Sequence, residues 1–227
     1  MKGWKQMKII EPYIIMEKYD AKKIMKNLEK ACRTCYRSED KITEESYKTL
    51  LKNCINRGHE SILEHEKITI QMVCDIGVYK DLTRHRLASF SIESTRYCNY
   101  GKDKFDNEIK FIKPCNIDED SEIYDFWKHT MERVEMNYLH MAARGATPDQ
   151  MRMLLPHSTA ALVTMTANIR EWKHILSLRT TMHTHPSVQQ VMIPLLLKFE
   201  KDMPEVFGNI EYNLKFPEEK FAEIKEM

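Results

Sequence analysis

The chain contains 227 residues, of which 42% are hydrophobic, and its 35 lysines and arginines against 34 aspartates and glutamates give a net charge of +1. These values argue against a disordered chain, which needs low hydrophobicity, and against a general nucleic-acid-binding surface, which needs excess positive charge. No apolar run approaches the roughly 18 residues of a membrane helix, and the polar N-terminus lacks the apolar centre of a signal peptide. We therefore expect one cytoplasmic domain over residues 1–227, without nucleic-acid or membrane partners.

The N-terminal part of the chain predicts a strand followed by two helices. Residues 7–16 are apolar and β-branched but contain Pro12, which fits an edge strand. Asp20 is placed to cap a helix, and a second helix follows Thr43 and ends at Gly58. The apolar stripe of the first of these helices consists of Ile24, Leu28, Ala31, Cys32 and Cys35.

The middle of the chain predicts strands around one long helix. Alternating apolar residues predict a strand over 68–74, and a shorter signal covers 109–111. The long helix spans about residues 119–144 and ends at Gly145, after which Thr147 is placed to cap a new helix. The side chains that we expect this long helix to bury are Ile123, Phe126, Trp127, Met131, Val134, Tyr138 and Met141.

The last third predicts a strand over 159–166 and helices over 168–179 and 188–199, the latter kinked or restarted at Pro194. Helices and strands are mixed without regular β-α-β alternation. The sequence therefore predicts the α+β class, with a small and mainly antiparallel sheet in one domain.

Isolated glycines and scattered cysteines exclude several kinds of site. The six glycines form neither a dinucleotide-binding nor a phosphate-binding loop. The six cysteines favour reduced thiols. Cys32 and Cys35 form a lone C-x-x-C pair on an apolar stripe, which favours buried thiols over zinc or redox chemistry.

The densest group of polar side chains lies in residues 84–97, RHRLASFSIESTRY. Arg84 and Arg86 flank His85, and guanidinium groups suit a phosphate or a pyrimidine edge because they donate several hydrogen bonds in fixed geometry. Ser94 and Arg96 share one side if this stretch is extended. An anion or nucleotide site and a surface salt-bridge cluster both fit this pattern.

A second group lies in residues 58–65, GHESILEH. His59, Glu64 and His65 are metal-ligand types, but their spacing does not match the zinc motif in which two histidines face one side of a helix, so we expect no metal. A polar turn that holds a ligand and a plain loop that ends a helix remain open.

A third group follows in NIREWKHILSLR, residues 168–179. Arg170 and His174 stand about 40° apart around a helix, but Arg179 stands about 180° from Arg170. Either the helix breaks before Arg179 or its opposite faces serve different sites. Alternatively, the apolar positions form the core and these polar residues face water. His183 and His185 are expected in a loop before the next helix.

The segment 84–97 resembles the signature of the flavin-dependent thymidylate synthases, RHRxxSxNExSxRY. The residues that match it are Arg84, His85, Arg86, Ser89, Ser94, Arg96 and Tyr97. Three further segments look like this family in the same order along the chain: 31–36, 58–65 and 152–179.

This resemblance implies methylation of dUMP to dTMP, with methylenetetrahydrofolate as carbon donor and with NADPH reducing a bound FAD. It also implies a homotetramer whose subunits share active sites, which would explain the opposite faces of Arg170 and Arg179. The residues implied at FAD are Ser61, Arg84, His85, Arg86, Asn168, Arg170 and His174, and those implied at dUMP are Asp81, Arg84, Ser94, Arg96, Arg152 and Arg179.

By this resemblance Arg179 lies beside the uracil, where a permanent cation stabilises negative charge on the ring and takes the place of a protein nucleophile. Two positions depart from the family pattern: Ser91-Ile92 replaces the usual Asn-Glu, and Asp81 replaces a common Gln or Glu. Glu93 is one position beyond the missing carboxylate.

Two rival interpretations remain. In the first, the protein is a thymidylate synthase that uses a cysteine nucleophile, and Cys115, in Pro114-Cys115-Asn116, is the candidate. A non-enzymatic module would instead use Arg84, Arg86 and Arg96 to bind nucleic-acid phosphates, with a steep dependence on salt.

Overall fold

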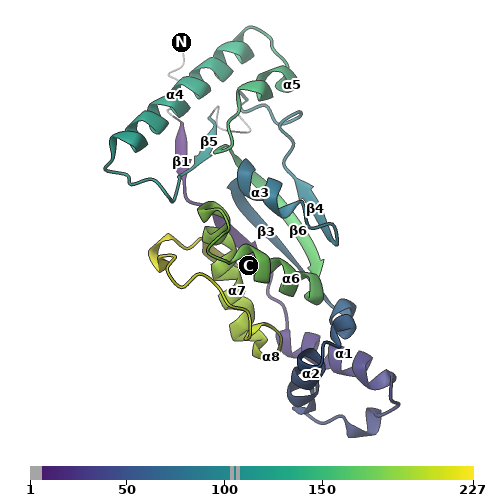
Figure 1. Cartoon of the computed structure of the whole chain (residues 1–227). Helices are drawn as coiled ribbons and strands as arrows, with labels where there is room; N and C mark the ends of the chain where they lie inside the picture. Colours follow the sequence, from purple (N-terminus) through teal and green to yellow (C-terminus); the bar gives the residue numbers. More distant parts are fainter. Residues whose placement is uncertain (1–6, 103–104, 106–107) are drawn as a thin grey trace.

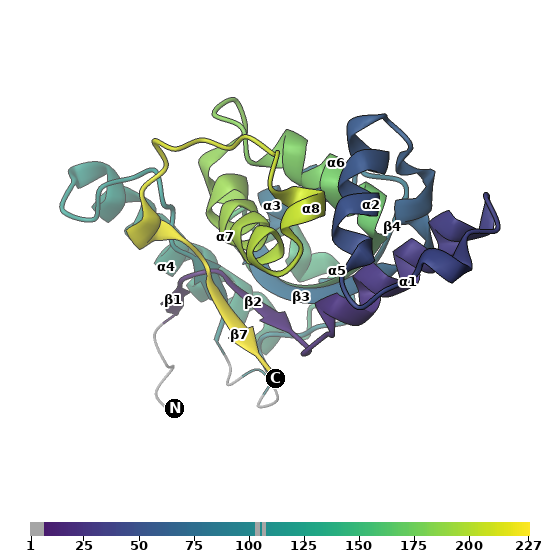
Figure 2. The same cartoon turned by 90° about the horizontal axis from the view of Figure 1, so that it is seen from below.

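The computed structural model describes residues 7–102, 105 and 108–227 and has the expected α+β architecture. The first six residues, on which the absence of an export signal partly rests, lie outside the described part. Helices cover one face of a five-stranded sheet, as Figure 2 shows. The strand order is β4 (Ala88–Ile92), β6 (Ala160–Asn168), β3 (Lys67–Asp75), β2 (Tyr13–Met16) and β7 (Glu223–Glu226).

The centre of this sheet is antiparallel, because β6 pairs with both β3 and β4 in that sense, while β2 and β7 run parallel. Ile68 and Ile70 of β3 are buried beneath the helices, whereas Thr69 points to the opposite face and contacts Thr166 of β6 with 2.8 Å between hydroxyl oxygens. The alternation expected over 68–74 is therefore confirmed. One face of the sheet forms the core, and the other carries polar side chains such as Thr69 and Thr166 beside apolar ones such as Val73 and Leu162.

The helical layer packs on the buried face around Trp172, which is fully buried and donates its indole N–H to the carbonyl of Ile68 at 3.0 Å. The helices are α1 (Ala21–Thr34), α2 (Ser46–Asn56), α3 (Ile76–Leu82), α4 (Glu122–Ala143), α5 (Pro148–Met151), α6 (Ile169–Arg179), α7 (Pro186–Asp202) and α8 (Pro204–Phe207). Short 3₁₀ turns include Glu60–His65, which links α2 to β3.

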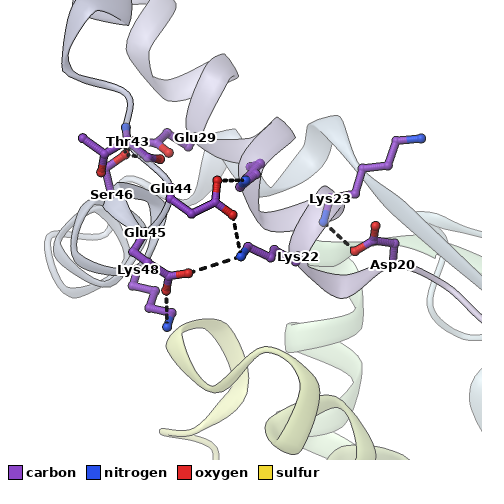
Figure 3. A network of polar contacts seen from close by, with 10 residues as sticks. Asp20, Lys22, Lys23, Glu29, Thr43, Glu44, Glu45, Ser46 and Lys48 are labelled. Carbon is purple, nitrogen blue, oxygen red and sulfur yellow. Dashed lines mark hydrogen bonds and ion pairs between the residues drawn. The ribbon is translucent and has the colours of Figure 1, made fainter.

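Helices α1 and α2 form one end of the molecule and are joined by polar contacts, drawn in Figure 3. Lys22 pairs with Glu44 at 2.7 Å and with Glu45 at 3.3 Å, but these exposed pairs contribute little stability. Glu29 is fully buried and accepts from Arg33 and from the hydroxyl of Ser46 at 2.7 Å. This carboxylate orients the start of α2 against α1.

The opposite end of the molecule is a second, smaller core in which α4 covers the two-stranded parallel sheet of β1 (Lys8–Ile10) and β5 (Lys110–Ile112), as Figure 1 shows. Tyr138 and Phe111 are fully buried there. The expected burial of Ile123 and Phe126 is wrong, since these side chains are 69% and 80% exposed. The first turn of α4 extends beyond this core, and the described chain provides no segment that covers it.

Several predicted helix ends are confirmed. The Asp20 carboxylate accepts from the backbone N–H of Lys23 at 2.9 Å, and Thr147 forms a capping box with Gln150. Gly58 and Gly145 have φ values of +75° and +84°, a conformation that favours glycine.

Other predictions need correction. Pro12 does not lie within one edge strand: it separates β1 from β2, which join different sheets, and β2 is internal because β7 pairs with its outer side. Cys32 is buried, but Cys35 caps the end of α1 and is exposed, because the helix ends one turn short of burying it. Helix α7 is not restarted at Pro194 and continues to Asp202.

Among the described helices, none combines the length and apolar character needed to cross a membrane.

Candidate functional site

The site is built where the end of α6 meets the end of α3. Asp75, the last residue of β3, caps α3 by accepting from the backbone N–H of Val78 at 2.8 Å. The chain then turns at the end of α3, and the backbone N–H of His85 donates to the Leu82 carbonyl at 3.0 Å. Helix α6 is unbroken to Arg179, so the possibility of a break before this residue is excluded.

Arg179 is held by two hydrogen bonds. Its Nε donates to Nε2 of His85 at 2.9 Å, and its Nη2 donates to the backbone carbonyl of Asp81 at 2.9 Å. On the other side of the imidazole ring, Nδ1 of His85 lies 3.5 Å from Oε1 of Glu171. His85 and Glu171 are each only 6% exposed. Arg179, His85 and Glu171, which come from two distant segments, therefore contact one another in series.

Burial is the main cause of the pKa shifts of His85 and Glu171. Burial lowers the pKa of His85 from 6.5 to about 4, and the Arg179 guanidinium and His174 act in the same direction. The ring of His174 lies edge-on to that of His85, with 5.7 Å between ring centres. Burial also raises the pKa of the Glu171 carboxyl, which the nearby His174 partly opposes. His85 is therefore neutral near pH 7.

A cavity of about 1110 Å³ opens beside His85 and Glu171, which both line it. Arg170 pairs with Glu64 at 2.5 Å across its wall, and Lys173 pairs with Glu60. The side chains of greatest chemical interest around it are Arg84, His85, Arg86, Asn168, Arg170, Glu171, Lys173 and His174, together with Glu60 and Glu64. Six of the seven residues assigned to FAD by resemblance are thus brought together.

The seventh, Ser61, is exposed and lies between two lining residues without lining the cavity itself. His59 and His65 of the same turn do not line it either. In the described part of the chain, no three His, Cys, Asp or Glu residues are arranged to hold a metal ion.

A second cavity, of about 500 Å³, lies against α3. Arg84 lines both cavities, and Asp81 lines the second one only. Cys115 is buried beside this second cavity, between two lining residues, and burial raises the pKa of its thiol. The other polar side chains of this wall are Asp75, Lys80, Asn116, His157, Ser158, His185 and Ser187.

The four remaining residues assigned to dUMP line neither of these two cavities in the single chain: Ser94, Arg96, Arg152 and Arg179. Arg96 is exposed and its Nε donates to Asp149 at 3.1 Å, and Arg152 is also exposed. Ser94 and Arg96 do not share one side of an extended strand, because the chain turns at Ser94: the Cys98 backbone N–H donates to its carbonyl at 2.9 Å.

Glu93 does not stand free to replace the missing family carboxylate. It accepts from the Tyr100 hydroxyl at 2.9 Å and from the backbone N–H of Leu162 at 3.2 Å, so it holds the loop after β4 to the sheet.

Sequence reasoning missed Glu171. Asn168 and Glu171 have the spacing of a capping box, a pattern that assigns the glutamate to the helix start. Only half of that box is formed: Asn168 accepts from the Glu171 backbone N–H at 2.8 Å, while the carboxylate faces His85. His185 directly precedes α7, in agreement with the expected loop before that helix, and its side chain caps the helix by accepting from the Ser187 backbone N–H.

Comparison with known proteins gives a consistent family. Residues 18–205 match the family model described as thymidylate synthase complementing protein. A flavin-dependent thymidylate synthase from Pyrococcus abyssi is 32% identical over 165 residues, which cover 72% of this chain and 67% of the relative. One from Corynebacterium glutamicum is 28% identical over 202 residues, covering 81% of this chain and 78% of the relative.

Solved structures share the fold. A UMP/dUMP methylase, PolB, from Streptomyces cacaoi, bound with 5-Br dUMP, aligns with a TM-score of 0.73 at 21% identity over 89% of this chain and 96% of that chain. Thymidylate synthase X from Helicobacter pylori, with FAD and dUMP, aligns with a TM-score of 0.71 at 19% identity over 88% of this chain and 98% of that chain.

Proposed function

Because this chain belongs to the flavin-dependent thymidylate synthase family, we propose that it methylates dUMP to dTMP with bound FAD, with methylenetetrahydrofolate as carbon donor and NADPH as reductant. The observation that carries the proposal is the placement of Arg179. Its guanidinium is fixed by His85, which lines the larger cavity, and by the backbone carbonyl of Asp81, which lines the second cavity.

The larger cavity suits FAD. Arg84 and Arg86 line its wall or mouth, and among the described residues neither forms an ion pair, so both have guanidinium donors for an anionic pyrophosphate. Asn168, Arg170 and His174 add polar groups from α6. When bound, the flavin supplies the hydride, and the protein contributes binding, orientation and electrostatics.

We place the uracil of dUMP near Arg179, Asp81 and Arg84, on the side of the second cavity. Ser94, Arg96 and Arg152 would then bind the nucleotide from a neighbouring copy of the chain, in the shared sites of a homotetramer. The exposure of Arg96 and Arg152, and the absence of all three residues from the walls of these two cavities in one chain, support this arrangement.

In this mechanism Arg179 favours negative charge on the uracil ring and so makes its C5 carbon nucleophilic. A fixed cation in a partly buried site is effective because it needs no reorganisation as charge develops. A cysteine nucleophile would have to be a thiolate, whereas burial raises the pKa of Cys115 and keeps its thiol protonated. The chain therefore needs no covalent bond to the ring.

The proposal is tested by assaying the purified protein for dTMP with dUMP, FAD, NADPH and methylenetetrahydrofolate, and by removing the bound FAD, omitting NADPH or omitting methylenetetrahydrofolate in turn. We expect a yellow protein whose dTMP formation requires all of them. A colourless protein that forms no dTMP and binds nucleic acid with a steep salt dependence would instead support the phosphate-binding module.

A further inference from the structure

We propose that Glu171 is a positioning residue for this reaction: it holds the His85 ring so that Nε2 accepts from Arg179 and fixes the guanidinium. The inference rests on the proposed function, because only there does Arg179 act on the uracil ring. Neither the family signature nor the sequence motifs assign Glu171 a role.

The hydrogen-bond direction determines the protonation of the ring. A guanidinium has no acceptor atom, so Arg179 Nε can only donate to His85 Nε2, which must carry a lone pair. A neutral imidazole then carries its proton on Nδ1, the atom that lies 3.5 Å from the Glu171 carboxylate. Glu171 is the acceptor that favours this tautomer and this ring orientation.

The permanent cations next to Glu171 on α6 have other partners, so the titratable groups nearest its carboxylate are His85 and His174. In the described structure, Arg170 pairs with Glu64 and Lys173 pairs with Glu60, although both flank Glu171 on α6. A buried carboxylate is unfavourable unless a polar partner satisfies it. The Glu171 carboxylate approaches Nδ1 of His85, while the capping half of the Asn168–Glu171 pattern uses the Glu171 backbone.

The two bonds of Arg179 fix the plane of its guanidinium, because they hold both Nε and Nη2. Loss of the His85 bond leaves one anchor, about which the group can rotate. Misplacement of a reacting group by about 1 Å can cost on the order of 100-fold in rate. In other enzymes, too, a carboxylate fixes the tautomer of a histidine that contacts the reacting side chain.

The test compares Glu171→Met, which keeps the volume but removes the acceptor, with Glu171→Gln, whose amide oxygen still accepts from Nδ1. Each variant is assayed as FAD-loaded enzyme, with kcat expressed per bound flavin and with the dissociation constant of dUMP measured separately. We expect Glu171→Met to lower kcat by about 10- to 100-fold, as second-layer contacts do elsewhere, with dUMP affinity less affected. Glu171→Gln should recover most of this loss.

Glu135 provides the matched control, since it is equally buried, lies in the other core and accepts from the Ile109 backbone N–H at 2.7 Å. Glu135→Gln should leave kcat per flavin unchanged. Equal losses in Glu171→Gln and Glu171→Met, or wild-type kcat in Glu171→Met, would overturn the inference.

A second measurement does not depend on the stability of a variant. In ¹⁵N-histidine-labelled wild-type holoenzyme, the nitrogen shifts of His85, assigned by its loss in His85→Gln, should show protonation at Nδ1. Protonation at Nε2 would refute the proposed positioning even if dTMP is formed. If Nδ1 is protonated but the wild-type enzyme makes no dTMP, the proposed function is rejected. The tautomer assignment then holds, but the positioning has no role in dTMP formation.

Discussion

Two arginine sites in this molecule differ in how firmly they are held. Arg179 is anchored through its Nε and Nη2 atoms to a buried histidine and a backbone carbonyl. Arg96 is exposed and forms one ion pair, with a side chain of Asp149 that is 62% exposed. The first cation is fixed before any ligand arrives, whereas the second can exchange its partner.

The difference teaches how one chain can divide its tasks. Preorganised charge suits a transition state, because it stabilises charge as that charge develops. An exposed ion pair contributes about 0–1 kcal/mol, so exchanging Asp149 for a nucleotide phosphate would lose little. We interpret the Arg179 region as the reacting half of the site and the Arg96 region as a binding half that a second copy completes.

The sharpest way to break this comparison is Arg179→Ala. Removing the fixed cation should lower kcat by about 100- to 1000-fold, the loss typical of one preorganised donor, and should leave FAD binding largely intact. Flavin absorbance and dTMP formation measure the two effects. Arg133→Ala, an exposed arginine of α4, is the control and should match the wild type. Near-normal turnover of Arg179→Ala would reject its role in activating the ring.

The next largest effect is expected for Arg96→Ala. Losing a charge-assisted phosphate contact should weaken dUMP binding by about 1.5–3 kcal/mol, measured by titration of the FAD-loaded protein. If subunits share sites, mixed tetramers of Arg96→Ala and Arg179→Ala should regain activity, because some sites receive both native arginines. Mixtures that stay inactive after subunit exchange would place both arginines in the site of one chain.

A smaller effect concerns stability and pH. The folded-state pKa of His85 is lowered from 6.5 to about 4, so between these values the unfolded chain binds the proton more readily. The contribution of His85 to stability is complete above pH 6.5 and is lost as the pH falls toward 4. Arg179, His174 and Glu171 are the charged or titratable groups that face it.

The measurement is the free energy of unfolding of wild type and His85→Gln between pH 7 and 4. The stability difference between them should shrink as the pH falls. The raised pKa values of Asp75 and Glu135 act in the opposite direction, but equally in both proteins, and so cancel. A difference that does not change with pH would mean that His85 is protonated equally in the folded and unfolded states.

The smallest effect on activity is expected for Cys115→Ala. Its buried thiol is protonated, so turnover should be unchanged while stability falls by about 1 kcal/mol, an ordinary loss for a buried position. Loss of turnover in a folded, FAD-loaded Cys115→Ala protein would establish the rival cysteine mechanism.

Local structure was largely predictable because it depends on neighbours in the chain. Apolar spacing identified β3 and α6, and cap residues such as Asp20 and Thr147 located helix starts. The motif of residues 84–97 gave the family, because its residue types and spacing are specific. Most of the residues assigned to FAD then proved to share one cavity.

Burial and partners were less predictable, since they depend on what covers a side chain. Helical spacing placed Ile123 and Phe126 on the apolar stripe of α4. It could not show that the core beneath this helix ends before it reaches these two side chains. Pro12 indicated an edge strand. It did not indicate that the strands before and after it, β1 and β2, belong to different sheets.

The amino-acid sequence by itself determined most of the longer helices and strands, though not α3, β4 or β7, together with the family and the set of polar residues available for chemistry. Only the tertiary structure decided that Glu171 faces His85 and that His85 accepts from Arg179. The reason is physical: periodicity records which face of an element is apolar, whereas a hydrogen bond between side chains 94 residues apart depends on how those faces are packed together.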